Sequence, residues 1–333
     1  MTPAAAIPVF VVSIGVMLAA SSLFAGRLDH IGLRLGLPET LLGLLTALAA
    51  DAPELSSAVT ALVENRHAVA VGVAVGASVF NLAAMLGLSA VVTARVRARH
   101  EVLELEAFVG LWMIAVAGLV AAGVLSGTIG AVLAGVVALP YVAVLAAGPG
   151  LARRLPLTAS ESRFLGRSFG EQHRKREPLD SHREAFRIGL VLVAALCLIV
   201  AGSVGAVRAA TSLADRWSVP QSLVGAVVLA VLTALPNAWT GIRFGLQQRG
   251  SALMSETLNS NSINVVAGIA LPAALGSVAT FSNLEVFDLM WLLAMTAAAV
   301  VMFGRRDGAG RSAGALLIVL YAVFVAAQVA ASV

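Results

Sequence analysis

Side chains with oxygen atoms interrupt the apolar sequence at two places that lie 183 residues apart. Asp51 and Glu54 are three residues apart in the first place, and Thr233 and Asn237 are four residues apart in the second. Each spacing puts both side chains on one face of a helix. Carboxylate, hydroxyl and amide oxygens are the ligands that hard cations such as Ca2+ and Na+ prefer. The sequence therefore predicts an oxygen-lined cation site that draws on both places.

A proline accompanies each pair, Pro53 in the first place and Pro236 in the second. Because proline has no N–H, the carbonyls of Ala49 and Leu232 lose their helical partners. Inside a membrane, such carbonyls are tolerated only where they line protein or water. We therefore expect both carbonyl oxygens to belong to the site, with a simple helix kink as the alternative interpretation of each proline.

A second polar segment follows each proline, at residues 76–81 and at residues 259–264. The constant offset of 183 superposes Pro53 on Pro236 and Asn81 on Asn264. A single ionised side chain near the middle of a membrane span costs roughly 3 kcal/mol. Four such helices therefore favour one shared hydrated cavity over separate polar contacts between helices. The candidate ligands are Ala49, Asp51, Glu54, Asn81, Leu232, Thr233, Asn237, Ser260 and Asn264, the two apolar residues through their carbonyls.

The composition predicts the elements that must position these residues. With 59% hydrophobic and 12% charged residues and a mean hydropathy of +0.93, the chain has too few polar side chains to coat a water-soluble globule. A helix needs about 20 apolar residues to cross a bilayer. Ten stretches qualify, at about 5–26, 39–63, 68–94, 104–125, 128–147, 187–207, 221–243, 252–276, 284–303 and 312–332. We predict an all-α integral membrane protein with ten transmembrane helices.

The basic residues predict the orientation of these helices. All of the 22 Lys and Arg residues except Arg66, Arg208 and Arg216 lie in alternate connectors, and connectors rich in them stay cytoplasmic. Both termini should therefore lie outside the cell membrane and the central connector inside. The same bias accounts for the net charge of +4 without nucleic acid as a partner.

The ten stretches divide into two halves with five stretches each. We expect a first repeat at 1–148 with its polar hairpin at 38–94, a basic cytoplasmic linker at 149–186, and a second repeat at 187–333 with its hairpin at 220–276. An odd number of spans in each half inverts the second half, which is the plan of secondary transporters. In the linker, Arg174–Arg176 sets the topology or, alternatively, contacts anionic lipid.

The two polar hairpins resemble the repeats of the cation/Ca2+ antiporter (sodium/calcium exchanger) superfamily. Those repeats read approximately Gly-Thr-Ser-x-Pro-Glu and, about 25 residues later, Gly-Ser-Asn-x-x-Asn, and the likeness is specific over 38–89 and 220–275. The resemblance implies a divergent, prokaryotic-type member in which Glu54 binds the cation. It also implies that Asn81, Thr233, Ser260 and Asn264 complete the ion sites. The sequence departs from the pattern at Asp51, where the family has serine, and at Asn237, where it has glutamate.

We therefore expect a secondary-active antiporter that exchanges a cation such as Ca2+ against Na+ or H+ by alternating access. Asp51 and Glu54 supply two negative charges, and their mutual repulsion makes proton exchange a candidate; Glu256 is either a vestibule residue or a surface group. A passive cation channel is one alternative. Another is a divergent member with a different small solute or no ion transport.

Other functional classes lack the residues that they need. The single Cys197 excludes a disulfide framework, the five histidines lie in or beside polar connectors, and no Ser-His or Cys-His set lies in the spans. No phosphate-binding glycine-rich loop is present. We expect no enzyme activity and no cofactor. The expected partners are small inorganic cations and membrane lipids, with no obligatory protein partner.

Overall fold

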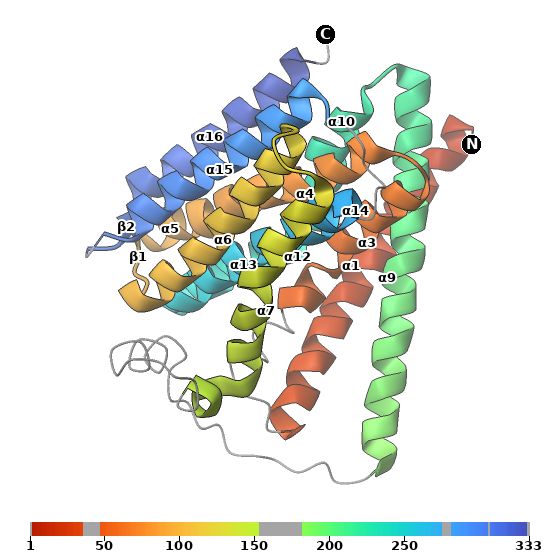
Figure 1. Cartoon of the computed structure of the whole chain (residues 1–333). Coiled ribbons are helices and arrows are strands. Elements are labelled where there is room, and N and C mark those ends of the chain that lie inside the picture. The colour runs from red at the N-terminus through yellow and green to blue at the C-terminus, as the bar shows by residue number, and fades with distance from the viewer. Residues whose placement is uncertain (1, 36–46, 153–181, 275–280, 306, 332–333) are drawn as a thin grey trace.

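The computed structural model describes residues 2–35, 47–152, 182–274, 281–305 and 307–331 (Figure 1). These residues are almost entirely helical. The exception in regular structure is an antiparallel ribbon of β1 (Arg95–Val96) and β2 (Ala309–Gly310). The ribbon joins the connectors that follow α5 and α15.

Helices lie on all ten predicted apolar stretches, of which residues 39–46, 275–276 and 332 are outside the described residues. The first half contains α1 (Pro3–Leu35), α3 (Ala52–Val63), α4 (His67–Asn81), the π-helical η1 (Leu82–Gly87), α5 (Leu88–Thr93), α6 (His100–Ala121) and α7 (Gly127–Ala152). The second half contains α9 (His182–Trp217), α10 (Gln221–Leu223), the π-helical η2 (Val224–Leu229), α11 (Ala230–Thr233), α12 (Leu235–Leu246), α13 (Gly250–Val265), the π-helical η3 (Val266–Ala270), α14 (Leu271–Ala274), α15 (Asn283–Phe303) and α16 (Arg311–Ala330). Both α7 and α9 extend into the predicted linker, whose residues 153–181 lie outside the described part.

Among the described residues, six helices are long and apolar enough to cross a membrane. They are Ala4–Leu28, His67–Thr93, Leu103–Ala121, Phe186–Trp217, Asn283–Phe303 and Arg311–Ala330. The pair Gln221–Thr233 and Leu235–Leu246, bent by 48°, raises the number to seven. The predicted number of ten is not reached because breaks and polar residues shorten or dilute the other segments: α3 has only 12 residues, and α13 carries the polar run that begins at Asn259.

The backbone of the second polar hairpin repeats that of the first at the offset of 183. A break interrupts each leading helix, at Asp51 (φ −79°, ψ −5°) and at Ala234 (φ −86°, ψ 2°). Each turn then contains a residue with left-handed backbone, Asn65 (φ 57°) and Gln248 (φ 57°). The break and the turn are therefore built in the same way in both hairpins.

The equivalence continues beyond the turns. A π-helical segment follows Asn81 in the first hairpin and begins two residues after Asn264 in the second. The next helices start at His100 and at Asn283, again 183 residues apart. The sequence offset thus describes the backbone from the break to the start of the fourth helix in each half.

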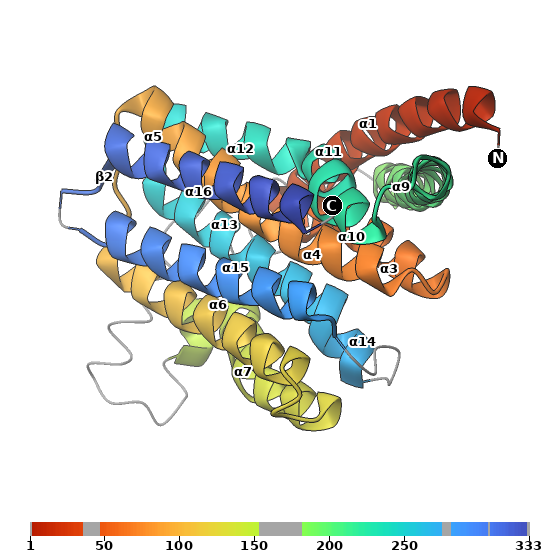
Figure 2. The ribbon, with the colours of Figure 1, turned by 90° about the horizontal axis from the view of Figure 1, so that it is seen from above.

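Glycines allow two close helix contacts in the interior. A Cβ atom added at Gly72 of α4 would lie 2.8 Å from the backbone nitrogen of Ala226 in η2, and one added at Gly76 would collide with the Ala226 carbonyl. Likewise, a Cβ at Gly202 of α9 would lie 2.8 Å from the carbonyl oxygen of Ser13 in α1. Helix α4 therefore lies at the centre of the bundle, and the two long helices α1 and α9 run side by side at its edge (Figures 1 and 2).

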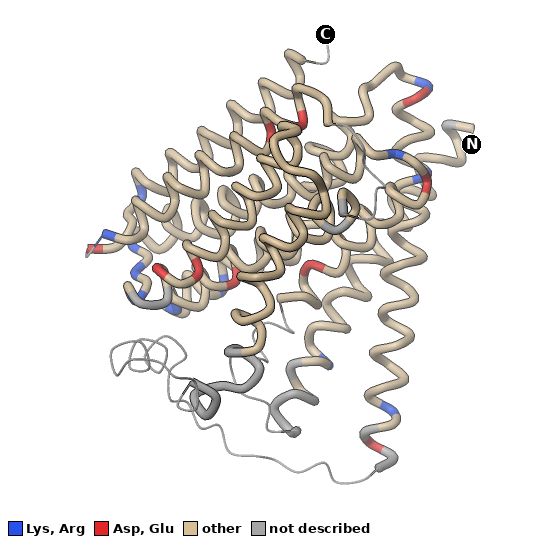
Figure 3. Tube along the Cα trace, viewed as in Figure 1, with Lys and Arg blue, Asp and Glu red and all other residues tan. Residues whose placement is uncertain are grey.

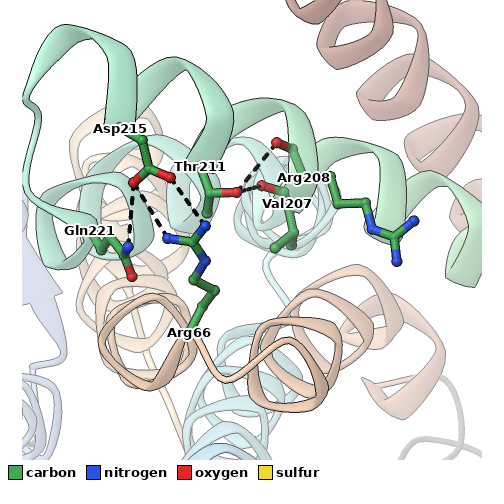
Figure 4. A network of polar contacts seen from close by, with 6 residues as sticks. All are labelled: Arg66, Val207, Arg208, Thr211, Asp215 and Gln221. Atoms are coloured by element: carbon green, nitrogen blue, oxygen red, sulfur yellow. Dashed lines mark hydrogen bonds and ion pairs between the residues drawn. The ribbon is translucent and has the colours of Figure 1, made fainter. Parts of the chain in front are cut away.

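Lys and Arg side chains gather at the ends of the helices (Figure 3). In the turn between α3 and α4, Arg66 Nη2 lies 3.1 Å from Asp215 Oδ2 of α9, and Gln221 Nε2 lies 3.5 Å from the same carboxylate (Figure 4). Arg208 of α9 pairs with Glu64 of the same turn. These contacts tie the first hairpin to the end of α9.

Candidate functional site

The break before α3 places two carboxylates in the protein interior. Asp51 occupies the N-cap position but its side chain makes no capping hydrogen bond, so the carboxylate is available to other groups. Glu54 lies in the first turn of α3, one residue after Pro53. Asp51 and Glu54 are each only 1% exposed. The predicted acidic pair is therefore buried at the start of one helix.

The amide of Asn237 bridges the two carboxylates. Its Nδ2 donates to Asp51 Oδ1 at 2.7 Å and to Glu54 Oε1 at 2.9 Å. Asn237 comes from the first turn of α12, directly after the second break. The two repeats thus meet at this point, with acids from one and an amide donor from the other.

Two further side chains complete a continuous network. Ser260 Oγ of α13 donates to Asp51 Oδ1 at 2.6 Å, and Asn81 Nδ2 of α4 donates to Ser260 Oγ at 3.0 Å. We call Asp51, Glu54, Asn81, Asn237 and Ser260 the central cluster. All five are at most 1% exposed. The structure therefore brings together five of the predicted site residues.

The remaining predicted residues lie around this cluster without a hydrogen bond to it. Thr233 is buried and its hydroxyl donates to the Leu229 carbonyl of its own helix at 2.9 Å. Asn264 is buried one turn beyond Ser260, and neither polar atom of its amide has a partner among the described residues. Glu256, one turn before Ser260, likewise has a buried Oε1 with no partner there.

The two predicted backbone ligands differ from each other. The Ala49 carbonyl accepts a hydrogen bond from Ser21 Oγ of α1 at 3.3 Å, so a side chain replaces the missing N–H of Pro53. Leu232 is half-buried and packs against the apolar cluster that α1 and α9 share. The roles of both carbonyls as ligands remain predictions.

Oxygen atoms without hydrogen-bond partners make the central cluster suitable for a cation. Asp51 Oδ2, Glu54 Oε2, Asn81 Oδ1 and Asn237 Oδ1 are buried and have no partner among the described residues. Buried polar atoms of native proteins are nearly always paired, so four orphan acceptors in one cluster need an explanation. Ca2+ takes six to eight such oxygen ligands, and Na+ is also a hard cation. The donor set therefore fits an alkali or alkaline-earth ion.

The electrostatics of the cluster also call for a positive charge. The ion pairs among the described residues involve other acids than Asp51 and Glu54. Burying an ionised carboxylate without a compensating charge is costly. No group of three or more His, Cys, Asp or Glu residues that could hold a metal occurs in the described part of the chain. A bound ion would therefore rely on amide and hydroxyl oxygens beside the two acids.

The sequence reasoning missed a second buried polar group, which contains Glu106, Tyr141, Ser255 and Asn259. Glu106 lies near the start of an apolar stretch, where a charged residue is commonplace. A signal was present, because Tyr141 is one of only two tyrosines and Asn259 belongs to the polar run of α13. The spatial meeting of these residues could not be deduced from either signal.

Solved structures with the same fold are exchangers by their descriptions or carry only a name. The sodium-calcium exchanger NCX_Mj matches with a TM-score of 0.62 at 17% identity, over 98% of this chain and 99% of that one. The H+/Ca2+ exchanger CAX matches with a TM-score of 0.74 at 13% identity, over 98% and 86%. YfkE matches with a TM-score of 0.67 at 16% identity, over 96% and 91%. A search of curated proteins gives no match.

A family-level comparison supports the same assignment at the level of sequence. The model of the family described as "Sodium/calcium exchanger protein" matches residues 5–147 and 188–330. These ranges cover most of the chain and contain all five residues of the central cluster. The resemblance deduced from the two hairpins is thereby confirmed, and with it an integral membrane protein. The chain belongs to the sodium/calcium exchanger protein family.

Proposed function

We propose that the protein is a secondary-active antiporter that exchanges a cation such as Ca2+ against Na+ or H+ at the central cluster. The observation that carries this proposal is the set of four orphan oxygens beside two buried carboxylates. The descriptions of the matched folds, a sodium-calcium exchanger and an H+/Ca2+ exchanger, support Ca2+ as one of the ions. Asp51, Glu54, Asn81, Asn237 and Ser260 are the proposed ligands, with Thr233, Asn264, Ala49 and Leu232 as further ones.

The proposed transport cycle is alternating access around this cluster. In it, ten spans form two inverted repeats of five, with the cluster near the middle of the membrane, both termini outside and the central connector in the cytoplasm. Helices α1 and α9 pack through small residues, which suits them to slide along the rest of the bundle. Binding of an ion pays for no chemistry; it shifts the balance between outward-open and inward-open states.

A counter-ion panel with purified protein in proteoliposomes tests this function. Vesicles loaded with Ca2+, Mg2+, Mn2+ or K+ are driven by an imposed Na+ gradient or pH gradient, and release of the loaded ion is followed. We expect release of Ca2+ that requires Na+ or H+ on the opposite side. Release that needs no counter-ion would instead indicate a passive channel, and no flux under any gradient would contradict cation transport.

A further inference from the structure

Four side chains form a closed hydrogen-bonded ring beside the central cluster. Tyr141 Oη of α7 lies 2.6 Å from Glu106 Oε2 of α6 and 2.7 Å from Asn259 Oδ1 of α13. Ser255 Oγ of α13 lies 2.7 Å from Glu106 Oε1, and Asn259 Nδ2 lies 3.3 Å from Ser255 Oγ. Glu106 is 5% exposed and belongs to the apolar span Leu103–Ala121. We call these four residues the Glu106 ring.

Counting hydrogens determines which group must carry an extra proton. The ring has four contacts, and each needs one hydrogen between its heavy atoms. The Tyr141 hydroxyl has one hydrogen but two oxygen atoms within 2.7 Å, so it satisfies only one of them. With an ionised Glu106, one of these short oxygen–oxygen contacts contains no hydrogen.

Turning the Asn259 amide does not remove the deficit. In the reversed orientation Nδ2 would donate to the Tyr141 oxygen, but Oδ1 would then face Ser255 Oγ, whose hydrogen is given to Glu106 Oε1. A protonated Glu106 fills all four contacts in one direction around the ring: Glu106 donates to Tyr141, Tyr141 to Asn259, Asn259 to Ser255, and Ser255 to Glu106.

The surroundings of the ring supply no positive charge to an ionised Glu106. Helix α7 brings Tyr141 to it, and α13 brings Ser255 and Asn259, with Glu256 next in sequence. The acids of α15, Glu285 and Asp288, lie at the start of that helix, whereas its end, at Gly304, approaches Leu103 of α6. On α6 itself, Glu104 lies 3.5 Å from His100 at the exposed end. The η3 segment has no titratable side chain.

The fold does not require polar residues at these positions. At the offset of 183, Leu289 corresponds to Glu106 and Phe324 corresponds to Tyr141, and both are fully buried in the apolar core. Gly72 and Gly76 likewise correspond to Ser255 and Asn259. The second half therefore builds the equivalent of this corner from apolar side chains. Packing alone does not explain the ring.

We propose that the Glu106 ring is a proton-binding site, separate from the central cluster, whose bound proton resides on the Glu106 carboxyl. Its proton closes the ring and so clamps α6 and α7 to α13, the helix that carries Ser260 next to Asn259. Loss of the proton opens one contact and loosens this clamp. The ligand is the proton itself, and the inference does not depend on which cations the central cluster transports.

Infrared difference spectroscopy of the purified protein in detergent tests the bound proton directly. The Glu106→Gln side chain offers the same donor and acceptor as a protonated glutamic acid, so this variant should fold. We expect the wild-type spectrum at neutral pH to contain a protonated-carboxyl C=O band that Glu106→Gln lacks. The matched control, Glu104→Gln on the exposed part of the same helix, should retain the band. An unchanged band in Glu106→Gln would overturn the proposal.

A pH series of melting temperatures provides the second measurement. Because only the protonated ring is complete, the melting temperature of the wild type should fall with rising pH relative to that of Glu106→Gln, whose ring cannot lose a proton. Parallel pH profiles for the two proteins would overturn the proposal. If Glu106→Gln does not fold, Tyr141→Phe replaces it in the infrared experiment: loss of its hydroxyl should shift the carboxyl band, and an unshifted band would contradict the ring.

Discussion

The two polar hairpins share a backbone but not a chemistry. Arg66 N donates to the Ala61 carbonyl at 2.8 Å in the first turn, and Arg249 N donates to the Phe244 carbonyl at 2.9 Å in the second, with every residue 183 positions on. Yet Glu54 corresponds to Asn237. The first hairpin therefore supplies the negative charges of the central cluster, and the second supplies the N–H groups that hold them.

This difference teaches that duplication fixed the positions while later substitution fixed the charge. Asp51, the second acid, corresponds to Ala234, which has no polar side chain at all. The cluster consequently carries at most two negative charges, and both lie on one side of the meeting point. Variants that make the two hairpins more alike test this division directly.

The largest effect is expected when the first hairpin is made like the second. Glu54→Gln replaces a buried carboxylate by an amide and removes the strongest proposed ligand. Loss of an outer-shell partner of a metal site costs about 10–100-fold in affinity, so loss of a direct ligand should cost more than about 100-fold. Ion exchange in proteoliposomes should fall to background, while Glu104→Gln should exchange normally. Unchanged exchange would remove Glu54 from the mechanism.

A smaller effect is expected when the second hairpin is made like the first. Asn237→Glu puts a third acid beside Asp51 and Glu54, and breaking the charge balance of a buried group costs about 3–5 kcal/mol when no cation compensates it. The melting temperature should therefore drop in chelator and rise more steeply with added Ca2+ than that of the wild type. Gln247→Glu, at the exposed end of the same helix, is the matched control. Equal responses to Ca2+ would argue against Asn237 as a residue that faces the ion.

The smallest effect concerns the face of α4 that corresponds to the ring-bearing face of α13. Gly76 corresponds to Asn259, but it meets the backbone of Ala226 instead of polar side chains. Gly76→Ala should destabilise the protein by about 1–3 kcal/mol because its methyl group has no room. Gly118→Ala, where nothing lies within 4 Å of the added carbon, should not destabilise it. Thermal unfolding in detergent compares the two, and equal melting temperatures would contradict the close contact.

Hydropathy and the repeated motif predicted the helices and the family because both depend on local sequence. The ends of α7 and α9 were missed because a helix can continue through polar residues beyond the apolar stretch. The ribbon between Val96 and Ala309 and the contact between Ser21 and Ala49 join distant segments, and no local pattern encodes them.

The central cluster was predictable in its members more than in its wiring. Asp51, Glu54 and Asn237 could be proposed because their types and positions repeat. That one amide nitrogen would hold both acids depends on how the two breaks are placed against each other, which is a property of tertiary packing. The Glu106 ring was missed for the same reason, since its residues belong to three helices.

The pair of acids in the central cluster also governs the influence of membrane voltage in the proposed cycle. One uncompensated elementary charge that crosses a potential of 100 mV gains or loses about 2.3 kcal/mol. Two carboxylates are neutralised by one divalent ion in one direction and by two monovalent ions in the other. Such a carrier crosses the field without net charge, so concentration gradients alone would drive it, and clamping the vesicle potential would leave its flux unchanged.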